Sequence, residues 1–277
     1  MLRSRTPNLT GGRDLPLAIV VGLALATVTF GALFYHPIAF TIVIGVVTAI
    51  AYLELRIVLR PVGRRIDVVV LMVATATMLF GAYNARHAGQ TIGVLILLFG
   101  AFLWHAADAE RQDVVQSAAT TLFFGLWVGF LASFGVLLVT RPDTGVIAVL
   151  AVVGAAAVHD IGAFAAGVKF GRHKIAPTLS PNKTWEGLAG GMLAAVIFGV
   201  GVLPFVGRLF DFLSGAIVAG LVALASFSGD LVESMVKRDL GVKDLGEVLP
   251  GHGGILDRVD GILFALPVGF YAIELFA

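Results

Sequence analysis

Carboxylate side chains recur at helical spacing inside apolar stretches of the second half of the chain. Asp230 and Glu233 are three residues apart and Lys237 follows four residues later, while Asp257 and Asp260 repeat the spacing of three. Residues three and four apart lie on the same face of a helix, so each stretch would present paired acids along one side. Such acids repel one another unless they share a cation. Oxygen ligands in a chain with no Cys suit a hard ion such as Mg²⁺.

Asp160, inside an earlier apolar stretch, is a fifth candidate ligand. A charge within a membrane costs about 2.5–3.5 kcal/mol even on lenient scales, so five such acids in one half of the chain require a reason. Pairing with neighbouring lysines and arginines at the membrane surface is the simpler alternative. The repeated spacing of three favours the metal site, because pairing alone does not require it.

Two polar segments carry basic residues that could bind phosphate. In the first, residues 169–186, basic side chains stand beside hydroxyl and amide groups: Lys169, Arg172, Lys174, Lys183, Ser180, Asn182 and Thr184. Such groups can cradle a polyphosphate, and Thr184 followed by Gly187 indicates a helix start, whose free N–H groups attract anions. The positive-inside bias of membrane proteins is the alternative explanation for these basic residues.

The second segment, residues 234–260, alternates basic with acidic residues, which a bias toward positive charge does not explain. The alternating residues are Lys237, Arg238 and Lys243 with Asp239, Asp244 and Glu247. The stretch from Pro250 to Gly254 predicts a tight turn directly before the next helix. Within this turn His252 could contact a phosphate or shuttle a proton, and a structural role is the alternative.

Together these segments resemble the phosphatidate cytidylyltransferase (CDP-diacylglycerol synthase) family. The family's C-terminal pattern is Ser-x-apolar-Lys-Arg, four residues, Lys-Asp-x-small, two residues, apolar-Pro-x-His-Gly-Gly-apolar-x-Asp-Arg-apolar-Asp. It is matched without a gap from Ser234 to Asp260. The stretch SPNKTWEG, at 180–187, is similar to a second family block, and Asp160 stands where the family has an aspartate-bearing helix. The resemblance covers about residues 155–265, with Phe164 where many members have Tyr.

The resemblance implies that CTP and phosphatidate react to give CDP-diacylglycerol and pyrophosphate for phospholipid biosynthesis. The reaction would be a metal-assisted, in-line attack of the lipid phosphate on the α-phosphorus of CTP. Mg²⁺, with a second cation as an option, would be held by Asp230, Asp257 and Asp260, with Asp160 and Glu233 as outer or additional ligands.

The remaining motif residues would act on the phosphates. The basic residues expected to contact them are Lys237, Arg238, Lys243 and Arg258. The nucleotide or pyrophosphate side would consist of Ser180, Asn182, Lys183 and Thr184. Two further residues, His252 and Asp244, would orient the site.

The composition indicates that these residues are positioned within a membrane protein. Of 277 residues, 58% are apolar and 13% are charged, whereas a soluble domain is about 45–50% apolar and about 25% charged. The absence of Cys excludes disulfides, thiolate zinc sites and Cys nucleophiles. A net charge of +1 argues against nucleic acid as a partner.

Continuous apolar runs predict an all-α, polytopic transmembrane bundle of about nine spans, with an uncleaved first span. The expected spans are Leu15–Tyr35, Ile38–Leu53, Ile66–Tyr83, Thr91–Ala107, Val114–Val139, Gly145–Ala165, Gly187–Val206, Phe212–Leu231 and Ile255–Phe276. Residues 1–150 read as scaffold and 151–277 as the catalytic region of one continuous membrane domain. Acids of the first half are expected at solvated helix ends: Glu54, Asp67, Asp108, Glu110 and Asp113.

The distribution of Lys and Arg predicts the orientation. With a cytoplasmic N-terminus, only Arg86, Arg141 and Arg208 of the 19 basic residues lie outside. We therefore expect a multi-pass protein of the inner cell membrane whose active site faces the cytoplasm. Membrane lipids are its surroundings, and a homodimer is left open.

Two other functions remain open at the level of sequence. The first is a transporter or channel for a phosphorylated metabolite, whose acids and bases would line a path. The second is a cytidylyltransferase that uses another lipid phosphate, because acceptor selectivity depends on the shape of apolar grooves.

Overall fold

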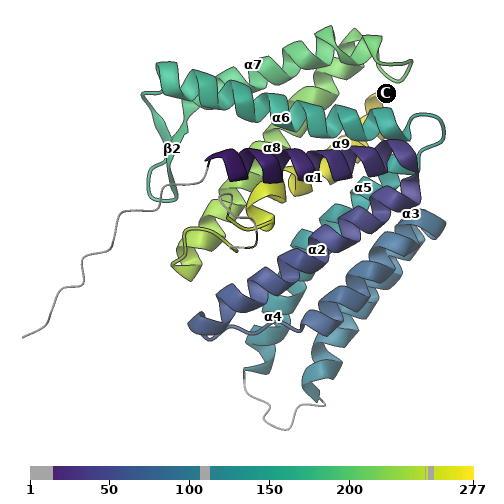
Figure 1. Cartoon of the computed structure of the whole chain (residues 1–277), viewed down its shortest axis with the longest axis vertical. Helices are drawn as coiled ribbons and strands as arrows, with labels where there is room; N and C mark the ends of the chain where they lie inside the picture. Colours follow the sequence, from purple (N-terminus) through teal and green to yellow (C-terminus); the bar gives the residue numbers. More distant parts are fainter. Residues whose placement is uncertain (1–14, 107–112, 247, 249–252) are drawn as a thin grey trace, which may run out of the picture.

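A computed structural model describes residues 15–106, 113–246, 248 and 253–277, and the described part is almost entirely helical (Figure 1). Seven helices in these ranges are long and apolar enough to cross a membrane, so the chain is a helical, multi-pass membrane protein. The elements are α1 (Leu15–Tyr35), α2 (Pro37–Leu59), η1 (Arg60–Val62), α3 (Val68–Ala106), α4 (Val114–Phe124), the π-helix η2 (Gly125–Phe130), α5 (Leu131–Val139), α6 (Gly145–Phe170), β1 (Lys174–Ala176), β2 (Ser180–Thr184), α7 (Trp185–Gly201), η3 (Leu203–Phe205), α8 (Phe212–Leu240) and α9 (Leu256–Phe276).

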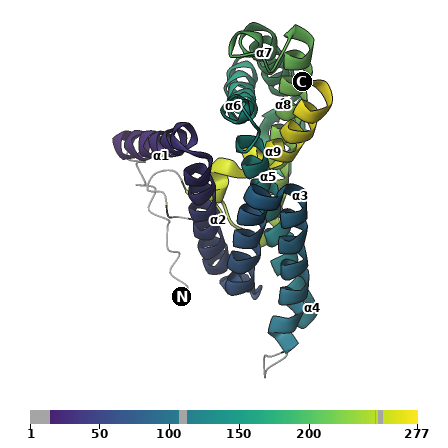
Figure 2. The same ribbon diagram turned by 90° about the vertical axis from the view of Figure 1, so that its right-hand side faces the viewer.

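The helices of the second half pack in sequence order, α6 against α7, α7 against α8 and α8 against α9. In the first half, α2 packs against α3, and α5 joins the two halves by contacting both α2 and α9. One apolar core cluster accordingly includes Leu79 of α3, Leu137 of α5, Val152 of α6 and Phe270 of α9. The helix α1 contacts α2 and projects away from the other helices (Figure 2).

The long element α3 consists of two antiparallel arms that reverse at Arg86, which has a φ of 51°. A Cβ on Gly89 would overlap backbone atoms of Gly81, and one on Gly100 would lie 2.9 Å from Val70 Cγ1. From the pair of Gly89 and Gly81 to the pair of Gly100 and Val70, the residue number rises along the second arm and falls along the first. This antiparallel order is the pattern of a helical hairpin. The predicted spans Ile66–Tyr83 and Thr91–Ala107 overlap these two arms, with Ala107 outside the described residues. Only small residues allow the arms to approach so closely.

The helix α8 begins and ends at strong sequence signals. Asp211 caps its start, where Oδ1 accepts a hydrogen bond from Ser214 N at 2.7 Å and Asp211 N donates to Ser214 Oγ at 2.9 Å. Hydrogen bonds from the backbone N–H and the side chain of Ser214 to the carboxyl group hold the pKa of Asp211 below its usual value. Gly241, with a φ of 67°, ends the helix. The helix therefore runs nine residues beyond the predicted end at Leu231 and carries Asp230, Glu233 and Lys237 on one continuous helix.

A short antiparallel hairpin interrupts the helices between α6 and α7. Its strands β1 and β2 pair Lys174 with Thr184 and Ala176 with Ser180. This hairpin was not predicted from the sequence, where residues 169–186 read only as a polar loop. It carries the Ser180–Thr184 block as an ordered strand.

We predict that Gly89→Val destabilises the protein, because the added side chain would force the two arms of α3 apart. Overpacking of this kind costs about 1–3 kcal/mol, so the apparent Tm in detergent should fall by several degrees. Gly31→Val is the matched control, since nothing lies within 4 Å of the position of its Cβ. Equal melting temperatures for the two variants would contradict the hairpin.

Candidate active site

Close contact between α8 and α9 brings the predicted acids together. A Cβ on Gly229 would lie 2.7 Å from the carbonyl oxygen of Asp260, and one on Gly261 would lie 2.6 Å from Ser226 Oγ. The backbones of the two antiparallel helices can therefore approach only because these residues are small. The carboxyl of Asp230 consequently lies beside that of Asp260.

The second acid pair follows the same antiparallel register. The carboxyl of Glu233, one turn further along α8, lies beside that of Asp257, one turn earlier on α9. The spacing of three on each helix thus places two acid pairs side by side. Four of the five acids chosen from the sequence meet at one place.

Two lysines partly balance these four carboxyl groups. Lys237 Nζ lies 2.6 Å from Glu233 Oε2 and 3.1 Å from Asp257 Oδ1. Lys183, at the end of β2, places its Nζ 2.8 Å from Asp230 Oδ2 and 5.1 Å from the centre of the Phe227 ring. Because the ammonium group of Lys183 is buried and makes no aligned hydrogen bond, its contact with Asp230 is an ion pair that leaves N–H donors unused.

An unmatched oxygen in this cluster fits a shared cation rather than a closed metal cage. Oε1 of Glu233 is buried and has no hydrogen-bond partner among the described residues, so one acceptor oxygen of the cluster is unmatched. Within the described ranges, no group of three or more His, Asp or Glu side chains is arranged to hold a metal by itself. Mg²⁺ usually takes one or two carboxylates and completes its shell with water and substrate phosphates. A partial site of that kind would draw on Asp230 and Asp260, with Glu233 as a further oxygen donor.

Asp257 differs from the other three acids because its carboxyl oxygens accept hydrogen bonds from backbone N–H groups. Leu245 N donates to Oδ2 at 3.0 Å and Gly254 N donates to the same oxygen at 2.9 Å, while Lys237 lies at Oδ1. Asp244 adjoins this turn, since a Cβ on Gly253 would lie 3.4 Å from its carboxyl carbon. Gly253 has a φ of 82°, a conformation that favours glycine. Asp257 therefore holds the described residues of the segment between α8 and α9 against the site.

The β1–β2 hairpin is fastened at both ends, which fixes Lys183. At its base, Glu186 accepts hydrogen bonds from the backbone N–H groups of Arg172 and His173 at 3.1 and 3.2 Å. In a third contact, His173 Nδ1 lies 2.6 Å from Glu186 Oε1. At its tip, Nε of Arg238 on α8 donates to the carbonyl oxygen of Leu179 at 3.1 Å.

Thr184 caps the helix that follows the hairpin, as its spacing to Gly187 predicts. Its hydroxyl oxygen accepts a hydrogen bond from Gly187 N at 3.1 Å, and the side chain is buried. The hydroxyl thus orients α7 and the adjacent Lys183.

The other predicted residues differ in their placement. Asp160 is exposed and contacts His159 Nδ1 at 3.1 Å, and no hydrogen bond or ion pair within the described ranges joins it to the four-acid cluster. Ser180 is half-buried on β2. The exposed side chains are those of Asn182, Lys243 and Arg258. His252 lies outside the described residues.

Two acids that the sequence placed at solvated helix ends, Glu54 and Asp67, are instead buried, while Asp108 and Glu110 lie outside the described residues. Asp67 directly precedes α3 and packs against α4, where its backbone N donates to Thr121 Oγ1 at 3.1 Å. Glu54 of α2 is only 2% exposed and accepts hydrogen bonds from Val248 N and Ile255 N. The expectation was wrong because α2 continues as a helix to Leu59, five residues beyond Glu54. An acid well inside an apolar helix was the signal that could have identified it.

Comparison with known proteins identifies the family of the chain. The model of the cytidylyltransferase family matches residues 17–276. A phosphatidate cytidylyltransferase of Mycobacterium bovis is 36% identical over 277 aligned residues, covering 93% of this chain and 88% of the relative. One of Thermotoga maritima is 34% identical, covering 74% of this chain and 77% of the relative. The chain belongs to the cytidylyltransferase family, which confirms the resemblance seen in its motifs.

We predict that Gly229→Ala weakens the protein although alanine favours helices. Its methyl group would push α8 from α9 and separate Asp230 from Asp260, lowering both the apparent Tm and the cytidylyltransferase activity. Gly220→Ala on the same helix is the matched control, because its Cβ would meet only Val196 Cγ2 at an ordinary 3.7 Å. That control should match or exceed wild-type stability by about 1 kcal/mol. The close-contact account fails if both variants behave alike.

Proposed function

We propose that this protein transfers the cytidylyl group of CTP to phosphatidate, releasing CDP-diacylglycerol and pyrophosphate for phospholipid biosynthesis. The observation that carries the proposal is the cluster of four acids and two lysines between α8 and α9, inside an apolar helix bundle. The relatives named as phosphatidate cytidylyltransferases support the choice of substrates. A charged site within apolar helices suits the meeting of a soluble nucleotide with a lipid headgroup.

In the proposed reaction, an oxygen of the lipid phosphate attacks the α-phosphorus of CTP in line with the leaving pyrophosphate. One P–O bond forms between the two substrates as the bond from the α-phosphorus to the bridging oxygen breaks. The attacking phosphate monoester is largely deprotonated at neutral pH, because its second pKa is about 6, so no protein base is required. The barrier lies in charge repulsion and positioning, which the protein can lower without a covalent intermediate.

The lysines of the cluster have distinct parts in this scheme. Lys183 offers its unused N–H donors to a phosphate of the nucleotide, while Asp230 keeps the ammonium group in place. Lys237 is held between Glu233 and Asp257 and supplies positive charge at the same face. Outside this pair, further phosphate contacts are assigned to Arg238, Lys243 and Arg258, and nucleotide contacts to Ser180 and Asn182.

Asp230 and Asp260 are the proposed protein ligands of Mg²⁺, with Glu233 as a further oxygen donor. Bound there, the ion would supply positive charge that offsets the charge of the reacting phosphates. Asp257 is assigned mainly to holding the adjoining segment and Lys237, because its oxygens already accept their hydrogen bonds. Asp244 and His252 are proposed to orient that segment, and Asp160 to act as an outer ligand.

Purified protein in detergent with labelled CTP, phosphatidate and Mg²⁺ should yield a lipid-soluble cytidine product and an equal amount of pyrophosphate. EDTA should abolish the product. Asp230→Asn and Asp260→Asn should each lower turnover at least about a hundredfold, as loss of a key electrostatic group does. Asp239→Asn is the control on the same helix, because its carboxylate pairs with Arg64 at the surface, at 2.8 Å.

If no product forms with any of several lipid phosphates, the proposed function is wrong and transport in sealed vesicles becomes the function to measure. Product with another lipid phosphate but not with phosphatidate would reassign the acceptor. Full activity of Asp260→Asn would refute the assigned site.

We also propose nine membrane spans with a cytoplasmic N-terminus in the inner membrane. Nine spans result when α3, one of the seven long apolar helices, is counted as two spans, one for each arm, and α1 is added. Arg86 at the reversal of α3 and Arg141 after α5 both contact Glu274, near the end of α9 opposite to the acid cluster. A cytoplasmic active site would therefore leave these two arginines on the outer side, in agreement with the positive-inside rule.

The absence of Cys from the chain makes this orientation directly testable. In sealed right-side-out vesicles, a membrane-impermeant maleimide should label Arg208→Cys at once but Arg65→Cys only after permeabilisation. Both arginines are exposed in the structure. The opposite labelling pattern would mean that the active site faces outward.

A further inference from the structure

We infer that Glu54 is a positioning residue for the active site: from α2, outside the motif-bearing region, it holds the segment that leads into α9. The expected effect of Glu54 on catalysis rests on the proposed function, whereas the hydrogen bonds that Glu54 accepts do not depend on it. The inference starts from a buried acid that the proposed reaction leaves without a role.

Each oxygen of the Glu54 carboxylate accepts one backbone hydrogen bond from this segment. Val248 N donates to Oε1 at 2.9 Å, and Ile255 N donates to Oε2 at 2.7 Å. The two donors are seven residues apart in sequence, so one side chain fixes two separate points of the segment. Hydrogen bonds to a charged acceptor are about twice as strong as neutral ones.

The surroundings of Glu54 show that this contact is specific. The side chain is 2% exposed, and no Lys, Arg or His in the described ranges forms an ion pair with it. A buried carboxylate without a cation depends on its hydrogen bonds. The backbone N–H groups of Val248 and Ile255 supply them only while these two residues keep their present positions.

Gly246 completes the contact from the other side. A Cβ at this position would overlap the carboxyl group of Glu54, and Gly246 itself lies against Gly254. The motif requires a small residue here, and the carboxyl group of Glu54 provides the physical reason.

Glu54 and Asp257 accept hydrogen bonds from different residues of the segment. Leu245 and Gly254 donate to Asp257, while Val248 and Ile255 donate to Glu54. Neighbouring residues 254 and 255 thus point their N–H groups to carboxylates on different helices, α9 and α2. A shift of the segment away from Glu54 would pull on the hydrogen bonds that hold Asp257, and through Asp257 would displace Lys237.

The test is Glu54→Gln, which keeps the shape of the side chain but leaves one acceptor oxygen for two donors. Hydrogen–deuterium exchange should rise in the peptides that contain Val248 and Ile255 and stay unchanged in the remainder of the chain. The kcat for CDP-diacylglycerol formation should fall about tenfold to a hundredfold, the scale expected for misplaced reacting groups.

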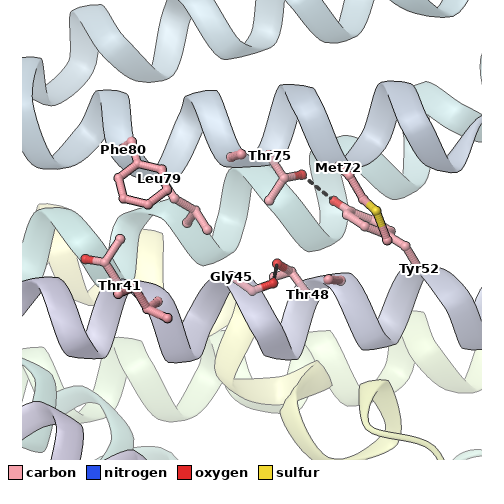
Figure 3. A pocket seen from close by; sticks show the side chains of 11 residues that line it. Thr41, Gly45, Thr48, Tyr52, Met72, Thr75, Leu79 and Phe80 are labelled. Atoms are coloured by element: carbon pink, nitrogen blue, oxygen red, sulfur yellow. Dashed lines mark hydrogen bonds between the residues drawn. The ribbon is translucent and has the colours of Figure 1, made fainter.

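Tyr52→Phe is the matched control on the same helix. The Tyr52 hydroxyl lies 2.8 Å from Thr75 Oγ1, beside a largely apolar cavity of about 250 Å³ between α2 and α3 (Figure 3). Its loss removes a buried hydrogen bond two residues from Glu54 without touching the segment. We expect wild-type exchange at Val248 and Ile255 and wild-type kcat.

The outcomes separate the inference from the proposed function. Unchanged exchange in Glu54→Gln would overturn the contact, and increased exchange with unchanged kcat would overturn the positioning role. If wild-type protein forms no product, the proposed function is wrong, and the exchange comparison alone decides whether Glu54 holds the segment. Should Glu54→Gln not be recovered folded, Gly246→Ala disturbs the same contact from the segment and must give the same local rise.

Discussion

Repulsion among four carboxyl groups, balanced by only two ammonium groups, is the constraint on which the organisation of this site depends. The acids are Asp230 and Glu233 on α8 and Asp257 and Asp260 on α9. Such a cluster would drive two helices apart if they were held only by apolar packing. Here small residues bring the backbones into contact, and the lysines offset part of the charge. The proposed cation would bind at these acids, and through that cation the site would assemble with phosphates.

Elements far from this cluster in the sequence keep its members in place. The β1–β2 hairpin delivers Lys183 and is itself fastened by Glu186 and Arg238. The scaffold helix α2 reaches the segment before α9 through Glu54. The two regions expected from the sequence are therefore in direct contact, because a side chain from the first half of the chain hydrogen-bonds to the segment beside the site.

Much of this arrangement could be predicted from local patterns. The spacing of three on two apolar helices predicted which faces would carry acids, and the Thr184–Gly187 spacing predicted a helix start. What sequence did not reveal depends on tertiary contacts. The hydrogen bonds that backbone N–H groups donate to Asp257 depend on how the segment just before α9 folds, and the burial of Glu54 requires a partner some two hundred residues away. The β1–β2 hairpin was also missed, because its short polar strands have no alternating apolar pattern.

The most direct test of the central claim measures cation binding rather than turnover. Electron paramagnetic resonance can count Mn²⁺ bound to purified protein in the presence of CTP, with wild type, Asp260→Asn and Asp239→Asn compared at equal concentration. The account predicts bound Mn²⁺ in the wild type and in Asp239→Asn, with a loss of at least tenfold in affinity for Asp260→Asn. Equal Mn²⁺ binding by all three proteins would show that the acids between α8 and α9 do not form the cation site.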